Sequence, residues 1–344
     1  MRGCRRLTIA SLVAALAIGA CTSPFLPEEP DATPLAVFDA FWSDFDAYYA
    51  FFGDKSVDWD AVRSVQRARV DDSTDERELF TVLQDMVSGF EDGHITIVTP
   101  FASWAYDGWR TNHPANYDAA LVARHSSGTL RAMGAGMRAG RLRPDIGYIH
   151  ISTFAGHGFG DAFNRALLEL GDVAALVLDV RSNGGGSDVN SDAVLQRLAD
   201  RSRVYGFASY RNGPRHTDFT APRPKHVAPG GGTRFAGPIA VVTNRGTFSA
   251  AEDFVLATRV LPDVIVVGDT TGGGSGNPYW RELPNGWSFR LSRWRVVGAD
   301  GLFYEGTGIP PHVPARLEDN DRLNGIDSML RTAEEQLRQR IAGS

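Results

Sequence analysis

Hydrophobic spacing divides the chain into two parts. Large apolar side chains recur at three- and four-residue steps through Phe38–Tyr49 and again through Leu79–Phe90. This spacing is typical of the buried face of an amphipathic helix. Ser73 and Glu76 have the spacing of a capping box, which is expected to open the second helix. The pattern therefore predicts an N-terminal helical domain over residues 35–98.

From residue 146 onward the pattern changes to short apolar runs separated by helical stretches. The runs are Ile146–Ile151, Ala174–Val180, Ile239–Thr243 and Val264–Val267. A near-continuous apolar run is typical of a strand buried on both faces, and strand–loop–helix units in series predict a largely parallel sheet. We therefore expect an α/β core over residues 146–344 that ends in one amphipathic helix, Asp319–Ile341. Residues 99–145 are expected to form a short mixed connection, with a strand-like piece at Ala119–Ala123.

The first twenty residues predict a secretory signal. Three arginines precede the apolar stretch Leu7–Ala20, which is too short to favour a membrane-spanning helix. Ile18–Cys21 resembles a bacterial lipobox, in which Cys21 becomes the lipidated first residue of the mature protein. An ordinary cleaved signal and a core helix are the alternatives. On the lipobox interpretation residues 1–20 are removed and residues 21–34 form a flexible tether. The protein then faces the periplasm on a lipid anchor, which we place at the outer membrane of a bacterial envelope.

Charge and cysteine content exclude several functions. The chain has 35 basic and 41 acidic residues, a net charge of −6, and removal of the signal leaves −9. No global basic field is available for a nucleic acid partner. Both cysteines, Cys4 and Cys21, lie near the N-terminus, and no histidine pair has metal-ligand spacing. We expect no metal and no cofactor. Lys55 and Lys225 are the only lysines, a scarcity that limits the choice of catalytic base.

Two loops follow apolar runs, and active sites of α/β sheets collect at such loops. One loop holds Gly184–Gly186, which lacks the dinucleotide and Walker-type phosphate fingerprints. It is either a plain tight turn or half of an oxyanion hole. The other loop leads to Ser249, whose spacing to Glu252 is that of a capping box. A helix N-terminus is also a favourable place for a nucleophile, so the two interpretations of Ser249 are compatible.

His94 and Glu305 are the remaining candidates for a site. His94 precedes the strand-like Ile95–Val98, where a histidine is more often a cap or a core residue than a catalyst. Glu305 lies in a loop rich in glycine and proline, where a solvated acid is the plain interpretation. Local sequence alone assigns neither residue to chemistry.

In combination and in order, these motifs resemble the carboxyl-terminal-processing (tail-specific) serine peptidases. Val177–Gly186 resembles the strand and oxyanion loop of that family, and Thr247–Glu252 resembles its nucleophile segment. Gly268–Gly273 and Gly308–Pro314 match its later landmarks. The resemblance covers most of the chain after the tether. It implies a crotonase-like α/β core with an N-terminal helical domain.

The family uses two kinds of catalytic base, and the sequence favours one of them. No lysine follows Ser249, and arginine stays protonated and cannot replace it. In the tricorn-like branch, a histidine after the N-terminal helices is the base and a late acid supports it, which matches His94 and Glu305. That branch carries a serine just before the histidine, where this chain has Gly93. Residues 99–145 are also too few to form the PDZ domain that many relatives contain. In this respect the chain resembles the lineage of retinoid-binding proteins of the photoreceptor matrix.

The resemblance implies a serine peptidase that cleaves peptides or unfolded proteins. Ser249 would attack the carbonyl, His94 would be the base, Glu305 would support the imidazolium, and the N–H groups of Gly185 and Ala250 would bind the oxyanion. A histidine base predicts activity that falls as the pH drops through roughly 6.5. The alternatives are a non-catalytic lipid- or peptide-binding protein on the same scaffold and an esterase. The sequence does not indicate an oligomeric state.

Overall fold

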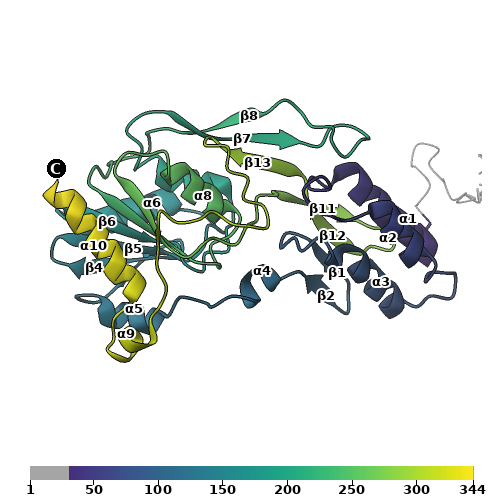
Figure 1. Ribbon diagram of the computed structural model, residues 1–344, viewed down its shortest axis with the longest axis horizontal. Coiled ribbons are helices and arrows are strands. Elements are labelled where there is room, and N and C mark those ends of the chain that lie inside the picture. The colour runs from purple at the N-terminus through teal and green to yellow at the C-terminus, as the bar shows by residue number, and fades with distance from the viewer. Residues whose placement is uncertain (1–30, 344) are drawn as a thin grey trace, which may run out of the picture.

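The computed structural model describes residues 31–343, which form two lobes joined by extended segments (Figure 1). In the smaller lobe three helices pack on a four-stranded sheet with the order β11-β12-β1-β2. Its elements are α1 (Pro34–Tyr48), α2 (Trp59–Arg67), α3 (Glu76–Ser88), β1 (Thr96–Val98), β2 (Ser103–Ala105), β11 (Pro278–Glu282) and β12 (Ser288–Ser292). Because β11 and β12 come from late in the chain, this lobe is built from two distant parts of the sequence.

The first predicted helix packs on this late hairpin. α1 begins at Pro34, and the hydroxyl of Thr33 accepts the N–H of Ala36, as expected for a proline-opened, capped helix. The rings of Phe41 and Phe45 are fully buried, and their centroids lie 4.9 and 5.7 Å from that of Phe289 in β12. The apolar stripe of α1 is therefore core, as its spacing predicts.

The second predicted helix begins two residues later than expected. Asp75 caps α3, and the Glu78 side chain accepts the Asp75 N–H in return. The prediction of a Ser73–Glu76 capping box is therefore wrong. The reason is local, because the Ser73 N–H and hydroxyl both donate to the Asp71 carboxylate and hold a turn before the helix.

The larger lobe contains a seven-stranded mixed sheet with the order β14-β10-β9-β6-β5-β4-β3. Its strands are β3 (Arg131–Gly134), β4 (Met137–Arg143), β5 (Ile146–Ile151), β6 (Ala175–Asp179), β9 (Ile239–Thr243), β10 (Val264–Gly268) and β14 (Val313–Pro314). The four apolar runs of the sequence form the adjacent parallel strands β5, β6, β9 and β10. The antiparallel strands β3 and β4 extend the sheet, so this part of the expected connection, residues 99–145, belongs to the core.

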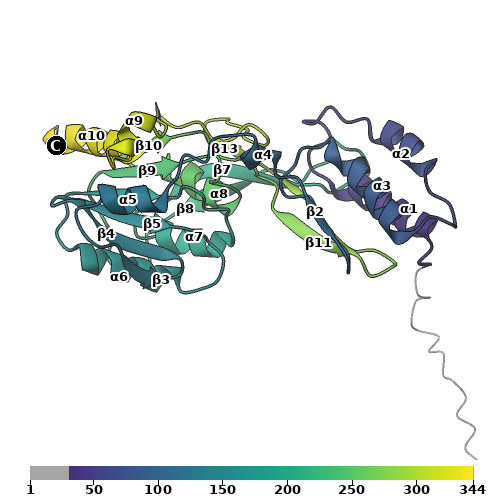
Figure 2. The same cartoon turned by 90° about the horizontal axis from the view of Figure 1, so that it is seen from below.

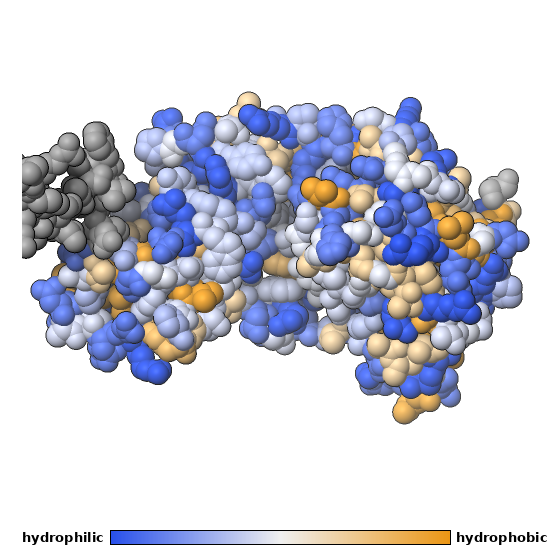
Figure 3. Space-filling model, turned by 180° about the vertical axis from the view of Figure 1, so that it is seen from behind, coloured by the Kyte–Doolittle hydropathy of each residue, from blue (hydrophilic) through white to orange (hydrophobic). Residues whose placement is uncertain are grey.

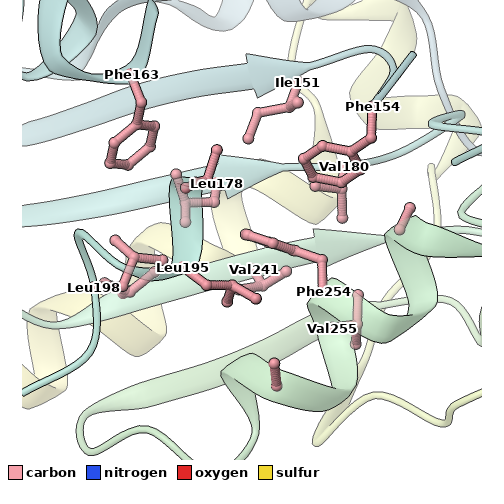
Figure 4. Packing of buried hydrophobic residues seen from close by; sticks show 14 of the residues in the cluster. Ile151, Phe154, Phe163, Leu178, Val180, Leu195, Leu198, Val241, Phe254 and Val255 are labelled. Carbon is pink, nitrogen blue, oxygen red and sulfur yellow. The ribbon is translucent and has the colours of Figure 1, made fainter. Parts of the chain in front are cut away.

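Helices cover both faces of this sheet (Figure 2). One face carries α6 (Phe159–Leu170), α7 (Asp188–Leu195) and α8 (Ala250–Thr258), and the other carries α5 (Ala119–His125) and α10 (Ser328–Ala342). On the first face Phe163 of α6 and Phe254 of α8 point toward Leu178 and Val241 of the central strands (Figure 4). This packing fixes the start of α8 at the carboxyl end of β9.

A third sheet, β13-β7-β8, spans the two lobes along one edge (Figure 1). Its strands are β7 (Arg203–Tyr210), β8 (Arg223–Val227) and β13 (Trp294–Gly298). β13 follows β12 after a single residue, so the chain leaves the smaller lobe directly along this sheet.

Two expected elements differ in the structure. Ala119–His125 is the helix α5, not a strand-like piece, because the Asp118 carboxylate accepts the N–H groups of Ala120 and Leu121 and caps a helix. The final helix is two helices, α9 (Asp319–Leu323) and α10. Gly325 at φ 73° separates them, and a new cap at Asp327 starts α10. A further short helix, α4 (Gly108–Thr111), lies between the lobes.

The face drawn in Figure 3 shows small separate apolar patches, and it is hollowed where the lobes meet. Within residues 31–343, no helix has the length and apolar character needed to cross a membrane. The expected signal, residues 1–20, lies outside the described residues. So do Cys21 and all but the last four residues of the expected tether, residues 21–34.

Candidate active site

Ser249 and His94 meet in the cleft between the lobes. Ser249 ends the loop after β9 and immediately precedes α8, whereas His94 lies in the turn between α3 and β1. The Nε2 atom of His94 lies 3.0 Å from the Oγ atom of Ser249, although 155 positions separate the two residues. The structure therefore brings together the two side chains that the sequence predicts as nucleophile and base.

The backbone of Ser249 is strained. Its φ of 58° and ψ of −127° lie in a region that residues with a Cβ atom rarely adopt. Such conformations cost about 1–3 kcal/mol and persist where the surroundings enforce them, often at functional sites. The Oε2 atom of Glu252 accepts the Ser249 N–H at 3.1 Å, which is the carboxylate half of the expected capping box. The resulting sharp turn presents the hydroxyl to His94 without the Gly-x-Ser-x-Gly motif.

Glu252 does more than cap the helix. Its fully buried carboxylate also accepts the hydroxyl of Thr271 at 2.5 Å and the N–H groups of Gly273 and Gly274 at 2.7 and 2.6 Å. Burial raises the pKa of Glu252 to about 7, although these donors and the Ser249 N–H lower it. The carboxylate ties a glycine-rich loop to the nucleophile turn. The spacing to Ser249 predicted only the cap, and the sequence signal for this second role is an acid in the first helical turn followed by a glycine run.

Aromatic rings enclose the His94 imidazole. The Phe248 ring centroid lies 4.7 Å from that of His94, and Trp109 stacks on Phe248 at 4.0 Å. A Cβ atom at Gly93 would lie 2.5 Å from the Nε1 atom of Trp109. Trp109 therefore occupies the space that the serine expected at this position in the tricorn-like branch would need.

The imidazole of His94 is neutral at neutral pH. Burial lowers the pKa of His94 to about 4, the Asp92 carboxylate opposes this shift, and the Arg290 guanidinium adds to it. A neutral imidazole can accept the proton of the Ser249 hydroxyl at its Nε2 atom.

Two buried acids lie near this histidine, and neither hydrogen-bonds its Nδ1 atom. The Oε2 atom of Glu305 accepts the Ser275 N–H and hydroxyl at 2.7 and 2.9 Å, while its Oε1 atom has no partner within residues 31–343. The Oδ1 atom of Asp92 accepts the His94 backbone N–H at 2.8 Å and lies 4.0 Å from Nδ1. The structure thus shows no direct Glu305–His94 bond, and Asp92, which the sequence analysis did not consider, is the nearer acid.

The glycine loop, Gly184–Gly186, lies against Ser249, but the Gly185 N–H makes a hydrogen bond that the prediction did not include. A Cβ atom at Gly185 would lie 2.8 Å from the Ser249 Cβ atom and 2.9 Å from the Ala250 nitrogen. The Gly185 N–H, expected as an oxyanion donor, donates to the Asn183 side chain at 2.9 Å. Over the described part of the chain, the N–H groups of Gly186 and Ala250 make no hydrogen bond. The loop is in place, and within the described residues its uncommitted N–H groups are those of Gly184 and Gly186, beside that of Ala250 at the start of α8.

The cleft around these residues has a volume of about 520 Å³. The larger lobe contributes Asp188 and Asp253 to its lining, and the smaller lobe contributes His94 and Arg290. In the described residues, no group of three or more histidine, cysteine, aspartate or glutamate side chains is placed to hold a metal ion. The chemistry that the cleft offers is that of a serine hydroxyl beside a neutral imidazole.

Known proteins share both the sequence and the fold. Residues 145–315 match the model of peptidase family S41, and residues 30–88 match the Tricorn protease C1 domain. The crystal structure of a candidate peptidase from Parabacteroides merdae is 34% identical, has a TM-score of 0.82 and covers 89% of this chain and 97% of that chain. The chain belongs to peptidase family S41. This assignment confirms the resemblance to the carboxyl-terminal-processing peptidases.

Curated relatives of this S41 protein are processing proteases. The carboxy-terminal processing protease CtpB of Bacillus subtilis is 29% identical over 51% of this chain and 35% of its own length. CtpA of the same organism is 27% identical over 54% of this chain and 38% of its own length. The chain thus spans little more than a third of the length of these relatives. The tricorn protease structure, at 16% identity and a TM-score of 0.59, covers 90% of this chain and 37% of that chain, and shares the fold.

Proposed function

We propose that this S41 protein is a serine endopeptidase that cleaves peptides or unfolded proteins through an acyl-enzyme. The observation that carries the proposal is the 3.0 Å contact between the Ser249 hydroxyl and a neutral His94 imidazole. A non-catalytic lipid- or peptide-binding protein needs no such pair. The proposal includes a crotonase-like relationship for the strand–helix core, on the strength of its serial strand–loop–helix units.

In the proposed reaction the Ser249 Oγ atom attacks the peptide carbonyl while His94 Nε2 takes the hydroxyl proton. The C–N bond then breaks, and His94 returns that proton to the leaving amine. Water attacks the ester with the same base, which releases the acid and restores Ser249. The Ala250 N–H binds the oxyanion together with a glycine-loop donor, either Gly186 or a Gly185 released from Asn183.

We assign the support of the imidazolium to the buried acids. Glu305 is the acid that the family resemblance names, and Asp92 is the acid whose charge raises the His94 pKa. Burial and the neighbouring Asp92 charge raise the pKa of Glu305 well above its ordinary value, whereas Lys55 opposes this shift. A carboxylate near Nδ1 stabilises the imidazolium that forms during proton transfer. Asp92 is therefore the more direct electrostatic support, because the raised pKa of Glu305 favours the neutral form of that acid.

A fluorophosphonate probe tests the proposal directly. The probe is expected to phosphonylate Ser249 of the folded protein, because it reacts with activated serine hydroxyls, and peptide mapping locates the adduct. Folded protein that remains unlabelled and turns over neither peptides nor esters would favour the binding protein. Turnover of esters without peptides would favour an esterase.

The pH profile is expected to differ from that of an ordinary histidine. Because His94 must be neutral to act as a base and burial lowers its pKa to about 4, kcat/KM should stay constant from pH 8 to about 5. It should fall only as the pH approaches 4, not near 6.5 as the unperturbed value suggests. Tryptophan fluorescence at each pH would confirm that the protein remains folded.

Two variants that each remove one charge test the electrostatic origin of the acidic limb of this profile. Asp92→Asn removes a charge that raises the His94 pKa, so the acidic limb should move to lower pH. Arg290→Gln removes a charge that lowers this pKa, so the limb should move to higher pH. A wild-type limb centred near 6.5, or shifts in the same direction for both variants, would contradict the electrostatic account.

We also propose that the protein is held in a bacterial envelope by lipid on Cys21 and faces the periplasm at the outer membrane. The support is the charged start, the apolar stretch and the lipobox-like Ile18–Cys21 of the sequence. Lipid chains would anchor the protein without a spanning helix.

A further inference from the structure

Arg290 is a cation on the wall of the cleft. It lies on β12, opposite Thr96 of β1, and its Nε atom donates to the Thr96 hydroxyl at 2.9 Å. Its guanidinium carbon lies 5.7 Å from the ring centroid of Trp280. These contacts hold the side chain at its Nε atom, and Arg290 is one of the residues that line the cleft.

The Arg290 guanidinium has no anionic partner in the described part of the chain. Among residues 31–343, no carboxylate lies within 4.0 Å of Arg290, and its terminal nitrogens make no hydrogen bond. Two arginines on neighbouring strands differ, because Arg281 pairs with Asp44 at 2.7 Å and Arg295 pairs with Asp54 at 2.9 Å. Burial lowers the Arg290 pKa, and only the more distant Asp92 opposes this. A half-buried guanidinium with free donors is suited to an anion from outside the chain.

The position of Arg290 indicates which part of a substrate it would meet. Arg290 and His94 both come from the smaller lobe, and the Arg290 charge is close enough to lower the His94 pKa. Since His94 must protonate the leaving nitrogen, residues after the scissile bond lie on its side of the cleft. The larger lobe lines the cleft with Asp188 and Asp253, and both carboxylates pair with Lys225, at 3.5 and 2.6 Å. Among the described charged residues that line the cleft, Arg290 is therefore the one without an ion-pair partner, and it lies on the leaving-group side.

We propose that Arg290 binds a carboxylate of the substrate on the leaving-group side of the scissile bond. The proposal rests on the peptidase function proposed above and adds its substrate class. Planar guanidinium groups bind carboxylates through two parallel N–H···O bonds. The carboxylate has two sources, the free terminus of a peptide that ends one or two residues after the cleaved bond, or an aspartate or glutamate side chain at those positions.

The test uses fluorogenic peptides of one core sequence, built around a cleavage site mapped first in an unfolded protein. One peptide ends as the free acid one or two residues after the cleaved bond, and its partner ends there as the amide. A second pair carries an internal aspartate or, for comparison, an asparagine at the same position. The carboxylate form is expected to have a kcat/KM about 10–100-fold higher through KM, the range for a hydrogen-bonded charge. All measurements are made at pH 7.5, above the acidic limb.

Variants of Arg290 test whether this residue causes the preference for a substrate carboxylate. In Arg290→Gln the ratio of carboxylate to neutral peptide is expected to fall to about one, and Arg290→Lys should retain part of it as a point charge. Arg293→Gln is the matched control, because Arg293 is exposed three positions along and does not line the cleft. A preference for the free acid over the amide assigns the terminal carboxylate, and one for aspartate over asparagine assigns the side chain.

Two results would overturn the proposal for Arg290 alone. They are equal kcat/KM values for carboxylate and neutral peptides in the wild type, and a preference that persists in Arg290→Gln. Failure of the peptidase function differs from both, because a folded protein would then show neither labelled Ser249 nor any cleavage, and both proposals would fall.

Discussion

Ser249→Ala is expected to lower kcat on a peptide substrate by about 10⁵- to 10⁶-fold, the range for loss of a serine nucleophile. The residual rate would come from substrate binding and the oxyanion donors. The variant should fold, because alanine keeps the Cβ atom and the backbone N–H that Glu252 accepts. Single-turnover kinetics would measure the loss of activity, and circular dichroism would test whether the variant is folded.

The matched control is Ser187→Ala. Ser187 is exposed at the end of the glycine loop, and its hydroxyl neither lines the cleft nor caps α7. Its kcat is expected to remain within about twofold of the wild type, as for surface substitutions away from a site. A Ser249→Ala protein with unchanged kcat would remove Ser249 from the mechanism, whatever the effect of the control.

Arg181→Met is expected to lower the free energy of unfolding by about 3–5 kcal/mol, the cost of breaking a buried ion pair from one side. The Arg181 guanidinium lies 2.6 Å from the Asp179 carboxylate and 2.9 Å from that of Asp327, and all three side chains are fully buried. Burial alone would raise the pKa of Asp179, but Arg181 holds it below its ordinary value. Urea denaturation at pH 7 measures the loss, because the variant leaves two carboxylates without their cation.

Arg203→Met serves as the control for this experiment. Arg203 pairs with Asp200 at the surface, where solvent screens the two charges, so the expected loss of stability is much smaller. The defect of Arg181→Met should shrink at low pH, where protonation removes the unpaired charge. Equal losses in the two variants at pH 7 would show that the buried network contributes no more than a surface pair.

Local signals predicted much of the central sheet and of the site. The four apolar runs form neighbouring strands, and the loops that follow two of them carry Gly185 and Ser249. The helical spacing and the apolar runs both predicted elements correctly, because the side chains determine whether a helix face or a whole strand is buried. The helix at Ala119–His125 was missed because five apolar residues in a row do not distinguish a strand from a short capped helix.

The residues that the sequence could not assign act through contacts between distant segments. Arg290 enters the cleft only because β12 pairs with β1, whereas Asp92 lies two residues before His94 and approaches the imidazole through a local turn. Glu305 was named by family resemblance, and its carboxylate is held by Ser275. No spacing along the chain encodes the placement of Arg290, which depends on the pairing of an early strand with a late one.

The late hairpin of β11 and β12 has a consequence for synthesis of the protein. It supplies Leu283, Trp287, Phe289 and Leu291 to the core that α1 and α3 cover. A nascent chain on the ribosome therefore cannot complete the lobe that holds His94 until about residue 292 has emerged. The contact between Ser249 and His94 therefore depends on a segment that is synthesised after both residues, so it cannot form while the chain stops short of β12.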